Sequence, residues 1–422
     1  MTAPTVGEPV LSRRFLGWRV VVLATITAAM SGPGQTIGVS VFVDPMIDAL
    51  DLTRSEVSTA YLVGTLLGAS ALVLVGRWID RIGARRAMAL IGLAFGTALL
   101  LMSGVQGLVT LMLGFTLIRW LGQGSLLLVS TLSITPWFER RRGFAFGLSS
   151  TATGVLMAFT PILLGAAIGA FDWRVAWILA AVAVWLVVVP IARFGIIDRP
   201  SDVGQYPDGD PAPHPSAEPV PATPSRTRRE ALGQRRFWVL SLVVATTSML
   251  ATALNFHQIS ILGAQGLTIT EAAAMFLPQI LGTIIAGLVV GALADKVPAR
   301  FLLALTMGLL GCSLVLAAIL EPGPMILLYA VVLGAAAGSQ WPLVSTILPR
   351  WYGLGHIGSI QGVSSLLTVA ASAAGPLALS LVSENIGGYS PGAWVLLAIP
   401  MVMGLAALTI REPEFKSTTR RS

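Results

Sequence analysis

The feature that most constrains this chain is a series of long apolar stretches that recur from near its beginning to near its end. An uncharged apolar run of about 18 residues or more is long enough to cross the hydrocarbon layer of a membrane as a helix. Charged residues make up only 11% of the sequence, whereas soluble domains contain about 25%. The sequence therefore predicts an all-α membrane protein.

Twelve transmembrane spans are predicted, in two groups of six. They cover residues 17–42, 56–76, 87–105, 108–134, 143–169, 174–195, 237–260, 271–292, 301–320, 324–348, 357–382 and 391–410. Eight prolines interrupt the polar stretch 196–236, which cannot bury a core and is predicted to be a disordered cytoplasmic linker. This divides the chain into a tail at 1–16, a bundle at 17–195, the linker, a second bundle at 237–410 and a tail at 411–422.

The basic residues are distributed very unevenly between the two sides of these spans. If both termini are cytoplasmic, 24 of the 27 Lys and Arg lie in cytoplasmic segments, and only Arg54, Arg119 and Arg174 do not. Cytoplasmic loops characteristically carry this excess of basic residues. We therefore expect a multi-pass protein of the inner (cytoplasmic) membrane with both termini cytoplasmic. The net charge of +7 then needs no nucleic-acid partner.

A short charged turn after the second span occurs twice in the chain. Its first copy is residues 76–86, and residues 76, 80, 81 and 85 of this copy correspond to residues 291, 295, 296 and 300. The offset is 215 at all four positions. Such a constant offset indicates a duplicated structural unit.

Twelve spans, a duplicated six-span half, a central linker and this turn resemble the major facilitator superfamily. The family's Gly-x-x-x-Asp-Arg-x-Gly-x-Arg-Arg signature is matched at Gly76, Asp80, Arg81, Gly83, Arg85 and Arg86. The second copy keeps Gly291, Asp295 and Arg300, and has Lys296 and Pro298 in place of Arg and Gly. The resemblance implies two pseudo-symmetric six-helix bundles that transport a substrate by alternating access.

Within the superfamily, two segments are similar to bacterial monocarboxylate transporters and oxalate:formate antiporters. These are residues 31–42, followed by Asp44, and the sequence Asn255-Phe256-His257-Gln258. The chain departs from those carriers in the eighth span, where they typically hold an Arg and residues 271–292 contain no basic residue.

The two charged turns predict a cytoplasmic gate. An aspartate at this surface can accept hydrogen bonds from helix-start amides and can pair with arginine. The alternative is a pair of basic loops that only set topology, although topology makes no demand for an acid. The predicted gate consists of Asp80, Arg81, Arg85, Asp295, Lys296 and Arg300.

Arg119 is the main candidate for binding substrate. It lies about 16 Å from the outer start of the fourth span, near the middle of the membrane. An arginine at this depth is costly unless it faces protein or water, so it is a functional candidate. It could bind a carboxylate, with Gln123 one turn further on. The alternative is a scaffold role, in which the guanidinium donates hydrogen bonds to backbone carbonyls.

Other polar residues within the spans are further candidates. Gln35 and Thr36 follow Gly32-Pro33-Gly34, which should break the first span and act as a hinge or expose groups to substrate. His257 is a candidate for proton coupling, and a histidine at the outer membrane interface is the favoured alternative. Asn255 and Gln258, three residues apart, can share one helix face and are further candidates for substrate binding. The remaining candidates, for which packing is the favoured alternative, are Tyr61, Gln279, Gln340 and Trp341.

The sequence thus favours a monomeric secondary transporter for a small, monocarboxylate-like organic anion, with proton symport or anion exchange. Efflux of amphipathic neutral compounds and a receptor or sensor that binds ligand without transporting it remain alternatives. No cluster of nucleophile and base suggests an enzyme. No cofactor or metal is expected, because the chain has a single cysteine, Cys312, and no phosphate-binding loop.

Overall fold

The computed structural model describes residues 15–210, 226–294, 296–353 and 356–410. These residues are helical throughout their regular structure and form no strand. Both predicted tails lie almost entirely outside the described residues, as does the proline-rich part of the linker.

The first bundle begins with a span built from several helical pieces. Its elements are α1 (Gly17–Ala29), η1 (Gly32–Gly34), α2 (Thr36–Ser40), α3 (Val43–Leu50), α4 (Arg54–Ile82), α5 (Ala84–Ser103), α6 (Leu108–Ile118), η2 (Arg119–Leu126), α7 (Leu127–Ile134), η3 (Thr135–Trp137), α8 (Arg142–Ala158), α9 (Thr160–Ala170), α10 (Trp173–Pro190) and η4 (Ile191–Gly195).

The linker contributes three short elements, and the second bundle then repeats the pattern of the first. The linker elements are η5 (Pro200–Val203), η6 (Pro207–Gly209) and α11 (Arg228–Leu232). The second bundle consists of α12 (Arg235–Gly263), α13 (Ile269–Ala274), α14 (Phe276–Leu293), α15 (Ala299–Ala318), α16 (Pro324–Gly338), α17 (Gln340–Tyr352), α18 (Ile357–Ile386), α19 (Tyr389–Leu396) and α20 (Ala398–Leu408).

The number of membrane spans agrees with the sequence. Across the described ranges, eleven helical stretches are long and apolar enough to cross a membrane, and the bent α4 makes a twelfth. Each of them overlaps one of the predicted spans. The duplication extends to whole elements, because α5 and α15 differ by 215 residues at both ends, and so do the first residues of α8 and α18.

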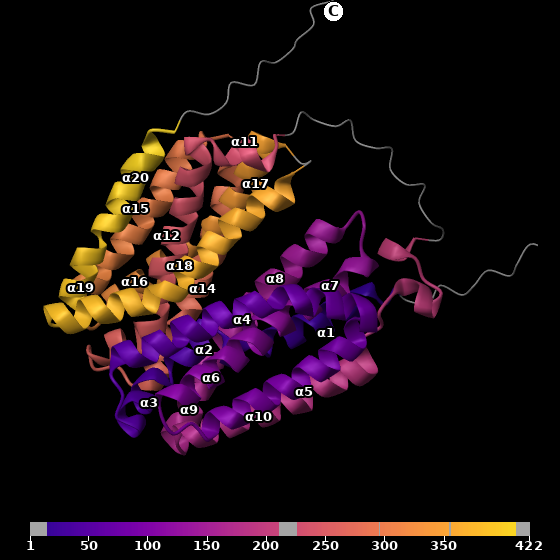
Figure 1. The fold of residues 1–422 in the computed structure, drawn as a ribbon, viewed down its shortest axis with the longest axis horizontal. Coiled ribbons are helices and arrows are strands. Elements are labelled where there is room, and N and C mark those ends of the chain that lie inside the picture. Colours follow the sequence, from indigo (N-terminus) through magenta and orange to yellow (C-terminus); the bar gives the residue numbers. More distant parts are fainter. Residues whose placement is uncertain (1–14, 211–225, 295, 354–355, 411–422) are drawn as a thin grey trace, which may run out of the picture.

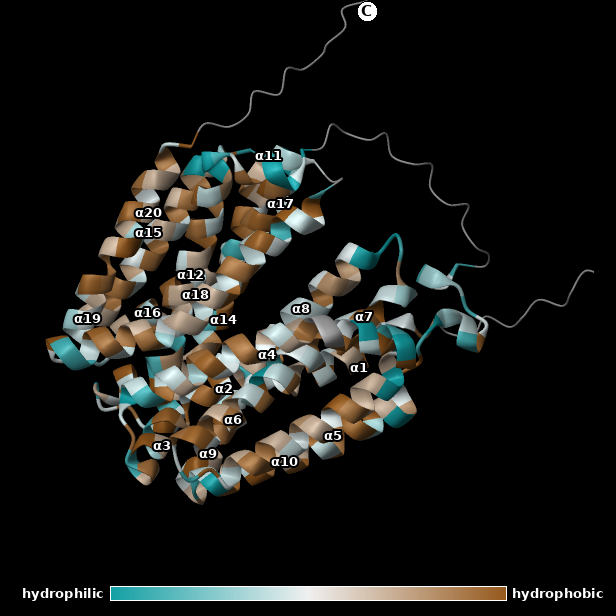
Figure 2. Ribbon diagram, in the orientation of Figure 1, coloured by the Kyte–Doolittle hydropathy of each residue, from teal (hydrophilic) through white to brown (hydrophobic). Residues whose placement is uncertain are grey.

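The two bundles meet toward one end of the molecule and diverge toward the other (Figure 1). We call the diverging end, where α5, α8 and α12 begin, the linker face, and the opposite end, where α3, α12 and α18 finish, the far face. Hydrophobic residues dominate the lengths of the helices, and hydrophilic residues gather near their ends (Figure 2). This distribution is the one expected of helices that cross a bilayer.

The first part of the linker is bound to the first bundle, so the prediction of disorder is wrong for this part. The side chain of Gln205 accepts the backbone N–H of Leu16 at 3.0 Å. The carboxylate of Asp208 accepts the backbone N–H groups of Glu139, Arg140 and Arg141 at 2.8–3.2 Å. Partial burial alone would raise the pKa of Asp208, but these donors and the charge of Arg140 outweigh it and lower the pKa.

Three glycines let α14 and α16 approach until their backbones touch. A Cβ atom added at Gly334 would lie 1.9 Å from the carbonyl oxygen of Gln279, and one at Gly338 would lie 2.2 Å from that of Thr283. A Cβ at Gly282 would lie 2.2 Å from the carbonyl oxygen of Val331. Small residues at such contacts are the usual means of packing helices within a membrane.

We predict that Gly334→Ala destabilises the protein by about 1–3 kcal/mol, because the added methyl group overpacks the contact with α14. The measurement is the thermal unfolding midpoint in detergent. Gly308→Ala is the matched control, since nothing lies within 4 Å of a Cβ at this helical position. Equal midpoints for the two variants would contradict the close packing of α14 and α16.

Candidate functional site

The break in the first span supplies an acceptor inside the first bundle. Gly32–Gly34 form a short 3-10 helix containing Pro33, Gln35 is extended with ψ 161°, and α2 then begins at Thr36. Proline has no backbone N–H to continue the α-helical bonding, which accounts for the break that the sequence predicts. The carbonyl oxygen of Gly34 accepts a hydrogen bond from Arg119 Nη1 at 3.2 Å.

Arg119 is held inside the first bundle by three different segments. Its Nε donates to Thr65 Oγ1 of α4 at 3.0 Å, and its guanidinium carbon lies 4.7 Å from the ring centre of Tyr61. Its side chain is only 3% exposed, and no other Lys, Arg, Asp or Glu of the described residues is buried. Arg119 also opens the π-helical segment η2, a geometry that often marks functional sites.

Tyr61 lies between Arg119 and the second bundle. Its hydroxyl group is hydrogen-bonded to Thr36 Oγ1 at 2.6 Å, and its ring packs at 4.7 Å from the ring of Phe256 on α12. The contacts of the guanidinium therefore all belong to the first bundle, and Tyr61 covers it on the side of the second bundle. Movement of the bundles apart at Phe256 would free this side of Tyr61.

The second bundle carries three amide side chains on α12 and α14, and one of them, Asn255, precedes Phe256 in the sequence. Gln279 Nε2 of α14 donates to Asn255 Oδ1 of α12 at 2.7 Å. Gln258 is fully buried, and neither its Oε1 nor its Nε2 atom has a partner among the described residues. The Oε1 atom of Gln279 also lacks one. Buried amides without partners are costly, so these are groups that a polar ligand could satisfy.

In the part of the chain that the structure describes, the other predicted residues make no hydrogen bond to Arg119. Gln340 is hydrogen-bonded to Ser248 at 3.0 Å, and Trp341 is 70% exposed. Gln123 is half-buried and makes no hydrogen bond to Arg119. Gln35 donates to Ser31 Oγ at 3.1 Å and lines a pocket of about 320 Å³ within the first bundle.

This pocket contains hydroxyl groups that were not predicted as site residues. No charged side chain lines it, and its polar residues besides Gln35 are Ser130, Thr131, Ser149, Ser150 and Thr153. A signal was available in the sequence, because the pairs 130–131 and 149–150 recur as Ser-Thr and Ser-Ser at the offset of 215 residues.

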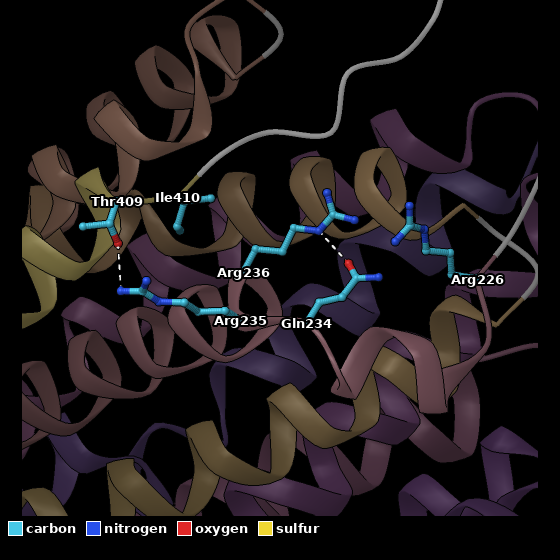
Figure 3. Close-up of a pocket in the computed structure, with 6 residues that line it drawn as sticks. All are labelled: Arg226, Gln234, Arg235, Arg236, Thr409 and Ile410. Carbon is cyan, nitrogen blue, oxygen red and sulfur yellow. Dashed lines mark hydrogen bonds between the residues drawn. The ribbon is translucent and has the colours of Figure 1, made fainter.

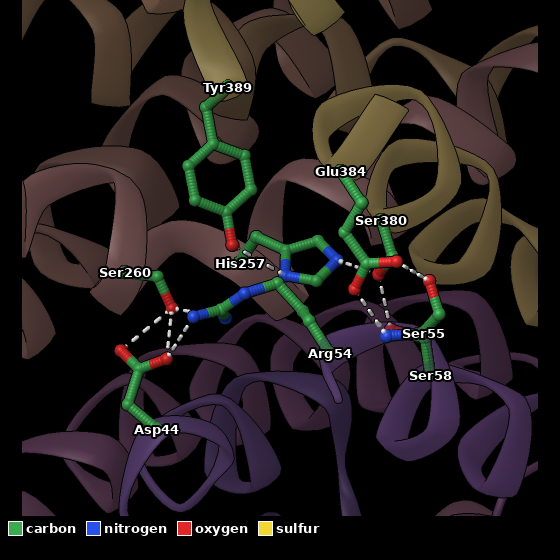
Figure 4. Close-up of polar contacts among 9 residues, drawn as sticks. All are labelled: Asp44, Arg54, Ser55, Ser58, His257, Ser260, Ser380, Glu384 and Tyr389. Carbon is green, nitrogen blue, oxygen red and sulfur yellow. Dashed lines mark hydrogen bonds and ion pairs between the residues drawn. The ribbon is translucent and has the colours of Figure 1, made fainter. Parts of the chain in front are cut away.

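At the far face, a polar network joins the two bundles (Figure 4). Asp44 and Arg54 of the first bundle form an ion pair at 2.7 Å. Ser260 of α12 donates its hydroxyl group to Asp44 at 2.8 Å and accepts from Arg54 Nη1 at 2.9 Å. A hydroxyl group of the second bundle is thus hydrogen-bonded to both members of a charge pair in the first bundle.

Glu384 of α18 caps the start of α4 in the other bundle. Its carboxylate accepts the backbone N–H of Ser55 at 2.9 Å and also the hydroxyl group of that serine. Thr53 and Glu56 form a capping box at the same helix start. An anion is favourable at a helix N-terminus, so Glu384 stabilises contact between the bundles at the far face.

His257 lies within this network and is fully buried. The carbonyl oxygen of Pro376 lies 3.0 Å from Nε2, which assigns the proton of the neutral ring to Nε2, and the hydroxyl group of Tyr389 lies 3.2 Å from Nδ1. Ser380 contacts the same Nε2 and is also hydrogen-bonded to Ser58 of α4 at 2.6 Å. Residues of α18 and α19 contact the ring near the far end of α12, and both its position at the membrane interface and its role in proton coupling stay predictions.

The pseudo-equivalent contact between α9 and α13 is of a different kind. At the offset of 215, Ser380 and Ser58 correspond to Gly165 and Ala273, and Arg54 corresponds to Ile269. A Cβ at Gly165 would lie 3.1 Å from the side chain of Ile269, and Ala273 is fully buried. One contact between the bundles is therefore polar, and its counterpart consists of small and apolar residues.

The predicted gate residues lie at the linker face. Asp80, Arg81, Lys296 and Arg300 are exposed, and Asp295 lies outside the described residues. The backbone N–H of Arg85 donates to Asp198, at the start of the linker, at 2.7 Å. Among described residues, no hydrogen bond or ion pair joins the two turns, so a gate between them remains a prediction.

Comparison with known proteins decides the family. The family model for the Major Facilitator Superfamily matches residues 21–323 and 256–422. The two matches together span nearly the whole chain. The chain belongs to the major facilitator superfamily. The structure is similar to that of the nucleoside transporter NupG, with a TM-score of 0.74 at 12% identity over 93% of this chain and 98% of the other. It is also similar to a bacterial homolog of the human lysosomal transporter Spinster in an inward-facing and occupied conformation, with a TM-score of 0.69 at 19% identity over 94% and 96%.

Two curated relatives carry a substrate class in their names. Monocarboxylate transporter 11 of Mus musculus is 28% identical over 358 residues, which cover 80% of this chain and 75% of that protein. The probable sulfoacetate transporter SauU of Cupriavidus necator is 24% identical over 143 residues, which cover 34% of this chain and 33% of its own length. The fold and the membership of a transporter family are therefore established.

We predict that Glu384→Gln shifts the protein about tenfold toward conformations open at the far face, because a neutral amide replaces the charged cap on α4. One charge-assisted hydrogen bond of about 1.5 kcal/mol corresponds to this factor. Spin labels at positions 48 and 385, placed in a Cys312→Ser background, should report a population with a longer distance.

The control for this experiment is Glu321→Gln, because Glu321 is exposed and lies outside the network. An unchanged distance distribution in Glu384→Gln would show that the carboxylate does not hold the bundles together.

Proposed function

We propose that this protein is a secondary transporter that moves a small, monocarboxylate-like organic anion across the inner membrane, together with a proton. The observation that carries this proposal is Arg119, the one buried charged side chain of the described residues. A single cation in an interior without acidic side chains favours a negatively charged substrate and disfavours a cationic one.

The geometry of Arg119 is compatible with a role in binding, although its contacts also make it a scaffold. Hydrogen bonds to Thr65 and Gly34 use Nε and Nη1, which fixes the orientation of the guanidinium. Arginine has five N–H donors in a planar fork, so donors remain for a carboxylate. Tyr61 would have to move aside, and its contact with Phe256 makes this movement depend on the separation of the bundles.

The relatives support the same class of substrate. Their names refer to a monocarboxylate and to sulfoacetate, both of which are organic anions. The partner-free amide of Gln258 and the partner-free Oε1 atom of Gln279 add neutral groups that could orient such a substrate from the second bundle.

We place the linker face in the cytoplasm, because most basic residues lie on this side of the spans. The polar network around Glu384 then closes the periplasmic side, and the structure corresponds to an inward-facing carrier. Rocking of the bundles would break this network and bring the two charged turns at Asp80 and Lys296 together.

His257 is the proposed proton-coupling residue. It is buried within the second bundle, and its contacts with Tyr389 and with Ser380, which is hydrogen-bonded to Ser58 of the first bundle, mean that a change in its protonation would alter the polar network itself. The charged groups of that network are Arg54, Asp44 and Glu384. Coupling through His257 would therefore act on the equilibrium between conformations.

We predict that Arg119→Gln and Arg119→Lys lower the uptake of pyruvate and acetate into proteoliposomes at least tenfold. Lysine keeps the charge but cannot reproduce the planar fork. Arg174→Gln removes an equal charge at the far face and should transport normally. Binding of the same anions is measured by thermal shift on the folded variants, so that loss of the site is separated from loss of the fold.

Unchanged uptake and binding of every carboxylate in Arg119→Gln would reject an anion substrate held by Arg119. Stabilisation by neutral amphipathic compounds instead would favour efflux of such compounds. If ligands bind but no counterflow of labelled substrate is found, the protein is a receptor.

We predict that His257→Gln abolishes the stimulation of uptake by external acid and leaves anion exchange intact. Glutamine can still donate to the carbonyl of Pro376, so the fold is expected to survive. His356→Gln is the control, because His356 is exposed at the linker face. A normal pH profile in His257→Gln would exclude this histidine from coupling.

A further inference from the structure

Three arginines line one pocket at the linker face of the second bundle (Figure 3). The pocket has a volume of about 670 Å³. It is lined by Arg226, Gln234, Arg235, Arg236, Thr409 and Ile410. These residues come from the end of the linker, the start of α12 and the residues after α20.

Among the described residues, the arginines are positioned by hydrogen bonds to neutral groups. Arg235 Nη2 donates to Thr409 Oγ1 at 3.1 Å, and Arg236 Nε donates to the side chain of Gln234 at 2.7 Å. The backbone N–H of Arg226 donates to the carbonyl of Tyr352 at 2.9 Å. No ion pair joins any of the three arginines to a described residue.

Within the described ranges, two aromatic rings and one acidic side chain lie near these arginines. The guanidinium of Arg236 lies 5.7 Å from the ring centre of Trp351 and 5.4 Å from that of Tyr352. The acid is Glu230 of α11, whose carboxylate already accepts the backbone N–H of Thr227. This bond and the hydroxyl group of Thr227, with smaller contributions from the charges of Arg226 and His356, lower the pKa of Glu230.

The start of α12 adds a further positive contribution. Gln234 is the N-cap residue, and its side chain makes no capping hydrogen bond. The first N–H groups of a long helix carry a partial positive charge and favour an anion. Together with the guanidinium groups, they provide the donors that suit a phosphate group.

The pocket adjoins exposed apolar surface on the two helices that line it. On α12, Trp238 and Leu242 are 40% and 43% exposed, one helical turn apart. On α20, which packs against α12, Leu408 and Leu405 are 44% and 64% exposed. Both pairs lead from the pocket toward the middle of the membrane. A charged pocket continued by apolar surface matches a phospholipid, with its charged head and apolar chains.

We propose that this pocket binds the phosphate headgroup of an anionic phospholipid of the cytoplasmic leaflet, whose acyl chains lie along α12 and α20. Basic pockets between membrane helices on this side bind such headgroups in general. The site involves neither Arg119 nor the contact between the bundles, so it does not depend on the nature of the substrate. Lipid bound here would join the start of the second bundle to its end.

The test is thermal unfolding of the full chain in detergent, titrated with dioleoyl-phosphatidylglycerol, dioleoyl-phosphatidylcholine or sodium phosphate. Only phosphatidylglycerol is expected to raise the midpoint. In Arg226→Gln/Arg235→Gln, the lipid concentration for half-maximal stabilisation should rise at least tenfold. Arg141→Gln/Arg142→Gln loses the same charge at the linker face of the first bundle and should respond like the wild type.

Two results would overturn the proposal. Equal stabilisation by sodium phosphate at the same concentration would identify a free anion as the ligand, and an equal response of both double variants would show attraction by overall charge. If the first double variant does not fold, native mass spectrometry on Arg226→Gln and Arg235→Gln separately replaces the titration. Retention of phosphatidylglycerol equal to that of the wild type in both would then also reject the site.

Discussion

The hydrogen bond between Arg119 and the carbonyl oxygen of Gly34 is the interaction on which the interior of the first bundle depends. A buried guanidinium within a membrane is costly unless its donors are satisfied, and a broken helix leaves backbone groups that also need partners. The hydrogen bond reduces both costs, because the carbonyl oxygen of Gly34 satisfies a donor of the guanidinium and the guanidinium satisfies this oxygen. The bond at 3.2 Å therefore explains why the Gly-Pro-Gly break and the arginine occur in the same bundle. The contacts of the guanidinium with Thr65 and Tyr61 also connect Arg119 to α4.

Much of the fold could be predicted from the sequence, because apolar length and the placement of basic residues are local properties. The twelve spans, the break at Pro33 and the offset of 215 residues are all present in the structure. Disorder was wrongly extended to residues near Asp208, because a proline-rich composition does not reveal that three backbone N–H groups lie within reach. Contacts between distant segments have no local signal of this kind.

The candidate site shows the same limit. Depth along a helix could be estimated for His257, but its neighbours Tyr389 and Ser380 come from elements more than 100 residues away. In the sequence, Glu384 is one acidic residue among many, with no motif around it. Its role as a cap for α4 depends on the position of one bundle against the other, which hydropathy does not contain. Arg119 can be predicted as a candidate from the sequence, because a charged residue is unusual at that depth and this signal does not depend on which residues contact it.

The unequal chemistry of the two contacts between the bundles has a consequence for the energetics of the transport cycle. An exact internal duplication would give two halves with interchangeable roles, and the movement of each half would have the same cost. Here, parting α4 from α18 removes hydrogen-bond partners from a carboxylate and uncovers the polar network around a charge pair and a buried imidazole, whereas parting α9 from α13 exposes mainly glycine, alanine and isoleucine. Salt and solvent polarity should therefore change the free energy of separating α4 from α18 more than that of separating α9 from α13. The two repeats then share the same geometry of movement but differ in its energetic cost.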